Sequence, residues 1–279
     1  MNAAAAACLK ADEEWRNSMK ADYKNWMPKG MVAGFGCGAA VFLILTVIFA
    51  AIPIPASVKK VLVVIFLIAT VFFLLVTVWM GLMYRAFSYD GNRKLSKQII
   101  DGVAAYVKVP DGGKGLDVGC GSAALTIACA KRNPNASFVG IDRWGKEYAS
   151  FNKALCVSNS KAEGVSNTTF MQGDAVKLPF EDETFDAVTS NYVYHNIPSR
   201  DRQKILLETL RTLKKGGIFA IHDIMSRAKY GDMNAFVKKL KNMGYEEVQL
   251  IDTTKGRFMT GFEAGWMGLS GSALLVGRK

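Results

Sequence analysis

The sequence is poor in the residues that build metal-bound or disulfide-bonded scaffolds. It has only 5 cysteines and 2 histidines among 279 residues, and no two cysteines form a C-x-x-C pair. This excludes a zinc ribbon and a disulfide framework, suits a reducing compartment, and leads us to predict no metal site. Low-complexity repeats are also absent, and 16 phenylalanines with 21% charged residues argue against a disordered chain.

Charged residues are missing from two long apolar segments, residues 31–52 and 61–83. Each is long enough to cross a bilayer, which takes about 20 helical residues. Pro53 and Pro55 lie between them and end one helix before the next begins. A buried hairpin of a soluble core is the alternative, but two adjacent charge-free segments favour a transmembrane helical hairpin. A cleaved signal peptide fits poorly, because a long segment precedes the first run and a second run follows at once.

Basic residues predict the orientation of this hairpin. The chain carries a formal net charge of +11, and only Lys59 and Lys60 lie in the loop between the two spans. The positive-inside rule therefore predicts a multi-pass membrane protein with both termini and the downstream domain in the cytoplasm. The flanking basic residues are Lys10, Arg16, Lys20, Lys24 and Lys29 before the first span, and Arg85, Arg93, Lys94 and Lys97 after the second.

Four segments follow from these patterns: residues 1–30, the hairpin at 31–83, a connector at 84–110 with a helix at 95–107, and a domain at 111–279. For the first segment two interpretations stay open. One is an amphipathic helix on the cytoplasmic leaflet, and the other is a loosely ordered tail. The helical spacing that supports the first involves Leu9, Trp15, Met19, Tyr23 and Trp26.

The pattern after residue 111 alternates short β-rich runs with helical stretches, which is typical of an α/β fold with a parallel sheet. We predict strands at 115–118, 137–141, 168–172, 187–190, 217–222, 246–251 and 273–276. Helices are predicted at 123–132, 146–158, 199–213 and 231–243.

Two features of the first strands indicate a bound nucleotide-like cofactor. The first strand runs into the turn Asp117-Val118-Gly119-Cys120-Gly121, and a helix follows. Glycines there allow a tight turn with close backbone approach. Asp142 ends the second strand, where a carboxylate can accept hydrogen bonds from ribose hydroxyls. Both features fit an adenosine-containing cofactor, and NAD fits them equally well.

Further motifs distinguish between these cofactors. Gly173-Asp174-Ala175 follows the third strand, and an L-K-K-G-G run precedes the fifth. With them, the chain from about residue 111 resembles the class I S-adenosylmethionine-dependent methyltransferases. One departure is Ala123, where many members have a third glycine. The resemblance implies a Rossmann-like, seven-stranded sheet of order 3-2-1-4-5-7-6 with strand 7 antiparallel, preceded in this chain by the transmembrane hairpin.

The resemblance also implies S-adenosyl-L-methionine as the cofactor and a set of residues that bind it. Gly119, Cys120 and Gly121 would pass beneath it, and Asp117 would orient its amino-acid end. Asp142 would hold the ribose, while Asp174 would accept from the adenine amino group. The alternative for each Asp is a turn-forming or capping role. The remaining implied binding residues are Arg143 and Trp144 beside the adenine, Gly173, Ala175 with its backbone N–H, and Asn191.

Residues 191–196 border the transferring methyl in this fold. They lack the N/D-P-P-Y/F motif, which counts against adenine and glutamine amino groups as acceptors. His195 and His222 follow the fourth and fifth strands, so each is a candidate general base, with a structural role as the alternative. Tyr192 is a further candidate that lines the pocket or packs in the core.

The connection between the last two strands, residues 252–271, is too apolar for an ordinary solvated loop. It is predicted to form a lid or entrance for an amphiphilic substrate, with packing over neighbouring helices as the alternative. Its apolar residues are Phe258, Met259, Phe262, Trp266 and Met267.

These observations predict a membrane-anchored methyltransferase that acts on a hydrophobic or lipid-like small molecule. Nucleic-acid binding is not expected, because no aromatic-basic module is present and an anionic inner leaflet explains the basic charge more simply. A soluble small-molecule acceptor remains an alternative, as does a catalytically silent anchor that binds the cofactor or a partner.

Overall fold

The computed structural model describes residues 20–145 and 150–279, and these form two units. One is the hairpin unit, Asn25–Ser96. The other joins residues 20–24 to Lys97–Lys279. Residues 20–28 are not helical, so the predicted amphipathic helix does not extend into them. The earlier part of that prediction, with Leu9, Trp15 and Met19, lies outside the described residues.

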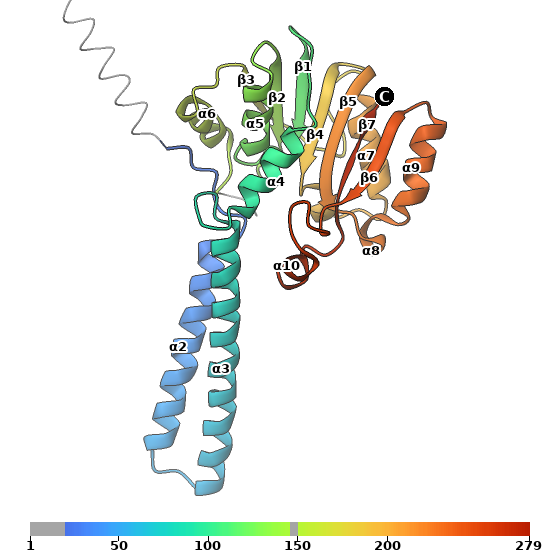
Figure 1. Ribbon diagram of the computed structural model, residues 1–279. Helices are drawn as coiled ribbons and strands as arrows, with labels where there is room; N and C mark the ends of the chain where they lie inside the picture. Colours follow the sequence, from blue (N-terminus) through green and yellow to red (C-terminus); the bar gives the residue numbers. More distant parts are fainter. Residues whose placement is uncertain (1–19, 146–149) are drawn as a thin grey trace, which may run out of the picture. The chain divides into compact units, whose positions relative to one another are not determined.

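The hairpin unit contains helix α2 (Lys29–Ala51) and helix α3 (Ala56–Phe87), joined by a short proline-containing turn (Figure 1). Both are long and apolar enough to cross a membrane. Only 6% of the most apolar window of each helix is buried within the structure. A core helix of a soluble protein would be mostly buried, so the packing favours the transmembrane interpretation. Helix α3 extends beyond the predicted span at both ends.

Aromatic rings hold the two hairpin helices together. Phe42 of α2 lies 5.1 Å from Phe73 of α3 between ring centroids, and Phe49 lies 5.2 Å from Phe66. Gly38 permits this close packing, because a Cβ there would lie 2.5 Å from the ring of Phe73. Small residues at such crossings allow the backbones to approach in the absence of a hydrophobic driving force.

The larger unit is built on a seven-stranded sheet of order β3-β2-β1-β4-β5-β7-β6, as predicted. The first five strands in the chain pair in parallel, and β7 runs antiparallel to both β5 and β6. The strands are β1 (Lys114–Val118), β2 (Ser137–Asp142), β3 (Thr168–Gln172), β4 (Phe185–Asn191), β5 (Leu213–Ile224), β6 (Glu246–Asp252) and β7 (Ser272–Arg278).

The helices of the larger unit differ from the predicted helices mainly in the residues at which they begin and end. Of the helix predicted at 146–158, residues 146–149 lie outside the described residues, residues 150–152 are not helical, and the rest belongs to α6 (Lys153–Ala162). The Asn152 side chain caps α6 by accepting from Leu155 N at 2.8 Å. The helix predicted at 231–243 is α9, which starts at Met233 because Gly231 has φ +73° and the Asp232 side chain caps the helix by accepting from Asn234 N at 2.9 Å. The remaining elements are α4 (Leu95–Ala104), α5 (Ala124–Arg132), the 3₁₀ turn η2 (Tyr194–Asn196), α7 (Arg202–Arg211), α8 (Arg227–Tyr230), α9 (Met233–Asn242) and α10 (Gly261–Trp266).

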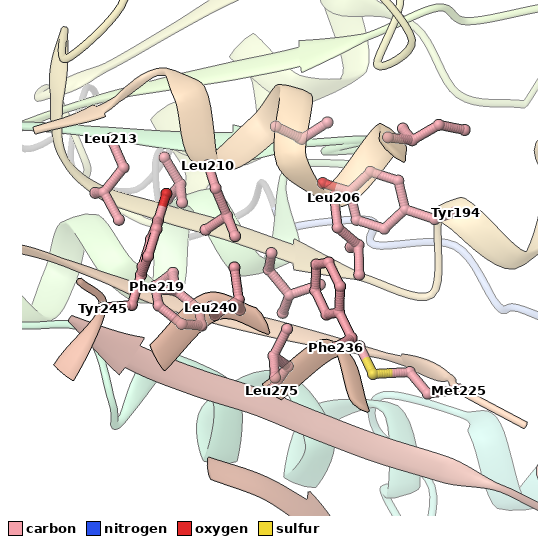
Figure 2. Close-up of a cluster of buried hydrophobic side chains, with 14 of the residues drawn as sticks. Tyr194, Leu206, Leu210, Leu213, Phe219, Met225, Phe236, Leu240, Tyr245 and Leu275 are labelled. Atoms are coloured by element: carbon pink, nitrogen blue, oxygen red, sulfur yellow. The ribbon is translucent and has the colours of Figure 1, made fainter. Parts of the chain in front are cut away.

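A core of buried side chains fixes helices α7 and α9 against the sheet (Figure 2). Leu206 and Leu210 of α7, Leu240 of α9 and Leu275 of β7 are all fully buried. Because the parallel strands are held in register by this packing, their carboxyl ends lie along one edge of the sheet, where ligands bind in open α/β folds.

Candidate active site

The glycine turn after β1 is packed too closely for any larger residue at its first position. Gly119 has φ +74°, and a Cβ on it would lie 2.2 Å from the Val193 side chain in the loop after β4. Gly121 also has a positive φ, +54°. Ala123 takes the third position with φ 70°, a left-handed conformation that costs a non-glycine residue about 1–2 kcal/mol. The turn therefore keeps its shape although Ala123 stands where the pattern has a third glycine.

Asp142 joins the end of β2 to this turn. One carboxylate oxygen accepts from Gly121 N at 2.9 Å, and the other accepts from Trp144 N at 2.8 Å. The Trp144 indole N–H donates to the Gly121 carbonyl at 3.1 Å. Arg143 is exposed between them. A carboxylate has about four acceptor positions, so Asp142 retains capacity for two hydroxyl groups.

Asp117 lies beneath the turn, with only 1% of its surface exposed. It accepts from the hydroxyl of Thr126 at 2.6 Å and from that of Thr189 at 3.0 Å. Burial raises the pKa of its carboxyl group to about 7. In this arrangement Asp117 supports the turn from below, and its predicted role at the amino-acid end of the cofactor stays a prediction.

The turn after β3 lies beside the end of β2. Gly173 N donates to the Asp142 carbonyl at 3.0 Å, and a Cβ on Gly173 would lie 2.4 Å from Ile141. Asp174 is exposed and accepts from Val176 N at 2.9 Å, while Ala175 is half-buried. The structure thus brings together the ends of β1, β2 and β3 with every residue predicted there.

These residues fit an adenosine-containing cofactor. The glycine turn leaves no Cβ at Gly119 or Gly121, Asp142 offers free acceptor positions, and Asp174 is accessible. Cys120 is buried, so its backbone is the part available to a ligand. No group of three or more potential metal ligands occurs among the described residues.

His195 and Asp223 form a buried pair at the ends of β4 and β5. Asp223 is fully buried and His195 is 14% exposed by side chain. The Asp223 carboxylate receives four donors, and although its burial alone would raise its pKa, the His195 contact and the other hydrogen bonds lower the pKa overall. The donors are His195 Nδ1–H, His195 N at 3.0 Å, Tyr230 O–H at 2.7 Å and Ile224 N at 2.6 Å.

This pairing fixes the tautomer of His195. Since Nδ1 donates to the carboxylate, the neutral ring keeps its lone pair on Nε2. The preceding Val193 packs on Gly119, so this segment lies next to the glycine turn. His195 therefore meets the geometric requirement for a base whose orientation is set by a carboxylate.

His222 is placed differently from His195. It is fully buried, and burial lowers its pKa to about 3. Nδ1 lies 2.8 Å from Asn191 Oδ1, and Nε2 lies 3.0 Å from Thr253 Oγ1. Both ring nitrogens are therefore engaged, Nδ1 with the Asn191 amide and Nε2 with the Thr253 hydroxyl, which itself donates to the Ser272 carbonyl at 3.0 Å. The geometry favours a positioning role for His222, which holds the Asn191 side chain at the end of β4.

Tyr192 has a strained backbone conformation, and its hydroxyl group forms a hydrogen bond. Its φ is +55°, unusual for an aromatic residue, and its ring lies 4.6 Å from the His222 ring. Its hydroxyl lies 2.8 Å from Ser272 Oγ, and burial raises its pKa. Because Ser272 donates to Leu269 O at 2.6 Å, the Tyr192 hydroxyl is the donor to Ser272. The geometry favours a packing role over proton removal.

The loop from Thr253 to Gly271 is partly core and partly surface. Phe258, Met259 and Met267 are buried, in line with the packing alternative. Phe258 lies against Gly102 of α4, where a Cβ would lie 2.3 Å from its ring. Phe262 at the start of α10 is 81% exposed, the only residue of the apolar set so open to solvent in the described chain.

Sequence reasoning missed Asp223, Tyr230 and Thr253 at this edge. Asp223 follows His222 directly at the carboxyl end of β5, so the rule that placed the two histidines there applied to it as well. Tyr230 and Thr253 give no comparable signal, because a single hydroxyl in a helix or loop is common.

The sheet order, the antiparallel β7, the glycine turn after β1 and the acid that ends β2 together define a class I S-adenosylmethionine-dependent methyltransferase fold. The comparison with protein families agrees. The family model described as a methyltransferase domain matches residues 110–265, and this chain belongs to that family.

Among curated relatives, the chain is 37% identical over 126 residues to the demethylmenaquinone methyltransferase of Bacillus cytotoxicus, covering 45% of this chain and 47% of that protein. It is 30% identical over 141 residues to the protein of the same name from Bacillus subtilis, covering 50% and 58%. The matches thus span about half the length of these curated relatives.

Solved structures show the same fold. A geranyl diphosphate methyltransferase in complex with GPP and sinefungin aligns with a TM-score of 0.52 and 14% identity, over 70% of this chain and 81% of that one. Phosphoethanolamine N-methyltransferase 2 of Haemonchus contortus, in complex with S-adenosyl-L-methionine, aligns with a TM-score of 0.51 and 15% identity, over 72% and 57%. At these identities the likeness concerns the fold alone.

Proposed function

We propose that this chain is a membrane-anchored methyltransferase that transfers a methyl group from S-adenosylmethionine to a hydrophobic, quinone-like acceptor. The single observation that supports the methyl-transfer part is the sheet of order β3-β2-β1-β4-β5-β7-β6 with β7 antiparallel, and Asp142 adds acceptor positions for ribose hydroxyls next to the glycine turn. The acceptor class is supported by the names of the curated relatives and by the two apolar helices.

S-adenosylmethionine supplies an electrophilic methyl group on a sulfonium. For its transfer the protein needs mainly to position the acceptor and exclude water, because the displacement is in line. Gly119 and Gly121 would allow the backbone to approach the cofactor, and Asp142 would hold its ribose. Asp174 would take the adenine amino group.

His195 acts as the general base in this proposal. Its Nε2 takes the proton of an acceptor hydroxyl, and the Asp223 carboxylate stabilises the imidazolium that results. Loss of this proton from a hydroquinone leaves a negative charge shared between the oxygen and the adjacent ring carbon. Either atom can then form the new bond to the methyl group while the methyl–sulfur bond breaks and leaves a neutral thioether. A carbon acceptor finally loses its ring proton to water, and its oxygen regains a proton from the His195 imidazolium, so that the product is again a hydroquinone.

The hairpin gives the proposed acceptor a physical rationale. A lipid-soluble quinone is confined to the bilayer, so an enzyme anchored there meets it at high effective concentration. Positive charges on both flanks of the hairpin support a cytoplasmic position for both termini and for the active site.

Isotopic methyl transfer tests the proposal. Full-length protein in vesicles made from cell membrane lipids would receive labelled S-adenosylmethionine, and the methylated products would be identified by mass spectrometry. Label in a quinone-like lipid supports the function. Label in a water-soluble metabolite would instead show that the acceptor is soluble. Cofactor binding without any labelled product would favour a catalytically silent anchor.

Two variants control this experiment. Asp142→Ala removes the proposed ribose acceptor and should reduce labelling at limiting cofactor. Asp182→Ala changes a surface carboxylate, 72% exposed by side chain, that forms an ion pair with Arg211 at 2.6 Å. It should label like the unchanged protein.

A further inference from the structure

The segment that precedes the membrane hairpin is docked on the methyltransferase unit. Residues 20–24, the N-terminal strap, run without helix or strand structure, and Tyr23 is only 7% exposed. Asn159 of α6 pairs with the strap backbone in both directions. Its Oδ1 accepts from Asp22 N at 2.8 Å, and its Nδ2 donates to Asp22 O at 3.0 Å.

The same asparagine also contacts the glycine turn. Asn159 Nδ2 donates to the Ser122 carbonyl at 2.9 Å, and the Ser122 hydroxyl donates to Tyr23 O at 2.8 Å. Ser122 directly follows Gly121, so its carbonyl and its hydroxyl are both bound to this assembly. The strap, α6 and the cofactor turn thus form one connected hydrogen-bond network, in which Tyr23, Ser122 and Asn159 are buried.

The inner face of α6 is suited to this contact because it is small and polar. Cys156, Asn159 and Ser160 are its buried residues. The Cys156 thiol lies 3.1 Å from the Gly121 carbonyl, one residue before the one that Asn159 contacts. A helix that only covered the sheet would present larger apolar side chains there.

We propose that Asn159 is a positioning residue that couples docking of the N-terminal strap to cofactor binding. The inference rests on the proposed function, since it assigns a further element to the same cofactor site. The strap holds Ser122 and thereby the shape of the glycine turn, so a docked strap favours the bound cofactor. By linkage, a bound cofactor favours the docked strap to the same extent.

Asparagine is the residue that this role requires. Its amide donates and accepts from one planar group, whereas Asp only accepts and Leu does neither, although both are of similar size. The strap is joined to helix α2 by residues 25–28 alone. Strap docking therefore connects the membrane anchor to the cofactor turn through the chain itself.

Hydrogen–deuterium exchange and calorimetry on the full-length protein in detergent test the coupling, with S-adenosylhomocysteine as the probe. The probe should slow exchange in peptides that cover residues 20–25. Asn159→Asp and Asn159→Leu should weaken probe binding about ten-fold, the effect of losing one or two hydrogen bonds, and should abolish this protection.

Asn167→Asp is the matched control. Asn167 Nδ2 donates to Ala136 O at 2.7 Å and Asn133 O at 3.2 Å, away from the turn. This variant should lose thermal stability but keep its affinity for the probe within about two-fold, because its hydrogen bonds touch neither the strap nor the turn. Tyr23→Ala tests the strap without altering α6, and it should weaken probe binding as the Asn159 variants do.

Unchanged probe affinity in both the Asn159 and the Tyr23 variants would overturn the coupling. So would hydrogen–deuterium exchange rates at residues 20–25 that are the same with and without the probe. Failure of the unchanged protein to bind S-adenosylhomocysteine at all would instead reject the proposed function, and this inference with it. The two failures are therefore distinguished by the first titration.

Discussion

At the scale of single residues, the contrast between the two histidines decides which one can act as a base. His195 retains one lone pair because Asp223 occupies only Nδ1, whereas both nitrogens of His222 are engaged. The two histidines have similar positions at strand ends in the sequence, but their neighbours leave a ring-nitrogen lone pair available only on His195. The proposed assignment of His195 as the base depends on that difference rather than on residue type.

Asp223→Asn should lower kcat by about 10²-fold or more, the contribution of a positioned general base, with little change in S-adenosylhomocysteine affinity. The amide presents hydrogens to donors and no longer stabilises a charged His195. Steady-state kinetics at saturating cofactor measure the effect. Tyr230→Phe is the control, since it removes one donor at 2.7 Å from the same carboxylate and leaves the His195 contact in place. Equal kcat losses in the two variants would contradict the base assignment.

His222 makes stability depend on pH in a direction that follows from its lowered pKa. The unfolded ring titrates near 6.5 and the folded ring near 3, so the unfolded chain binds more protons between these values. Stability from this group is complete above about pH 6.5 and is lost as the pH falls toward 3. Chemical denaturation of unchanged protein and of His222→Asn from pH 7 to pH 4 should show a shallower decline in the variant. Parallel curves would refute the buried neutral ring.

At the scale of elements, helix α6 depends on a cap that also places the proposed positioning residue. Asn152→Ala should reduce the free energy of unfolding by about 1 kcal/mol, because Leu155 N loses its acceptor. Asn152→Asp keeps an acceptor and should cost little. Urea denaturation of the two variants measures the difference. Similar losses in both would mean that the side chain is not the cap that starts α6.

The same helix shows where sequence patterns were informative and where they were not. The strand order was predicted, because the motifs at the ends of β1, β2 and β3 identify the fold. The start of α6 was not predicted, because Asn152 is only one of several residues in that region whose types can cap a helix. Contacts such as Asn159 with Asp22 join residues 137 positions apart, and no local pattern encodes them.

In the candidate site, too, local patterns predict some residues and long-range contacts place the others. The positions of Asp142, Asp174 and the glycines at the strand ends could be predicted because their spacing from those ends is repetitive and local, and their roles in cofactor binding stay predictions. One of the two interpretations of residues 1–30 makes Tyr23 part of a membrane-surface helix, since its spacing with Trp26 is helical, and the other makes it part of a loosely ordered tail. The structure instead buries it on the methyltransferase unit, where Ser122 and Asn159 satisfy the adjacent backbone. Long-range hydrogen bonds outweighed a weak helical periodicity.

At the scale of the whole molecule, the first question is orientation. A cysteine at Ser57, in the predicted external loop, should react with an impermeant thiol reagent added to intact cells. A cysteine at Lys255, whose side chain is 82% exposed in the methyltransferase unit, should react only after lysis. The unchanged chain, with Cys37 exposed along α2, is the background control. The reverse labelling pattern would overturn the positive-inside prediction.

The second question is what the anchor contributes to catalysis. Deleting residues 1–83 removes the hairpin and also the N-terminal strap, so cofactor affinity should fall together with access to the membrane. A segment that served only as an anchor would leave cofactor binding nearly intact when deleted, and strap docking argues against that expectation. A simple loss of activity in the truncated protein would therefore not identify the cause.

A ratio of two substrates separates the effects. Both forms would be assayed at saturating S-adenosylmethionine with a long-tailed quinol in vesicles and with its tail-less, water-soluble analogue. A weakened cofactor site lowers kcat/KM for both acceptors alike, whereas loss of anchoring lowers only that for the vesicle-borne one. The ratio of kcat/KM for the lipid acceptor to that for the soluble one should fall about ten-fold or more on truncation, because tethering raises the effective concentration of a membrane-confined partner. An unchanged ratio would mean that the hairpin only locates the enzyme and does not help it to capture its acceptor.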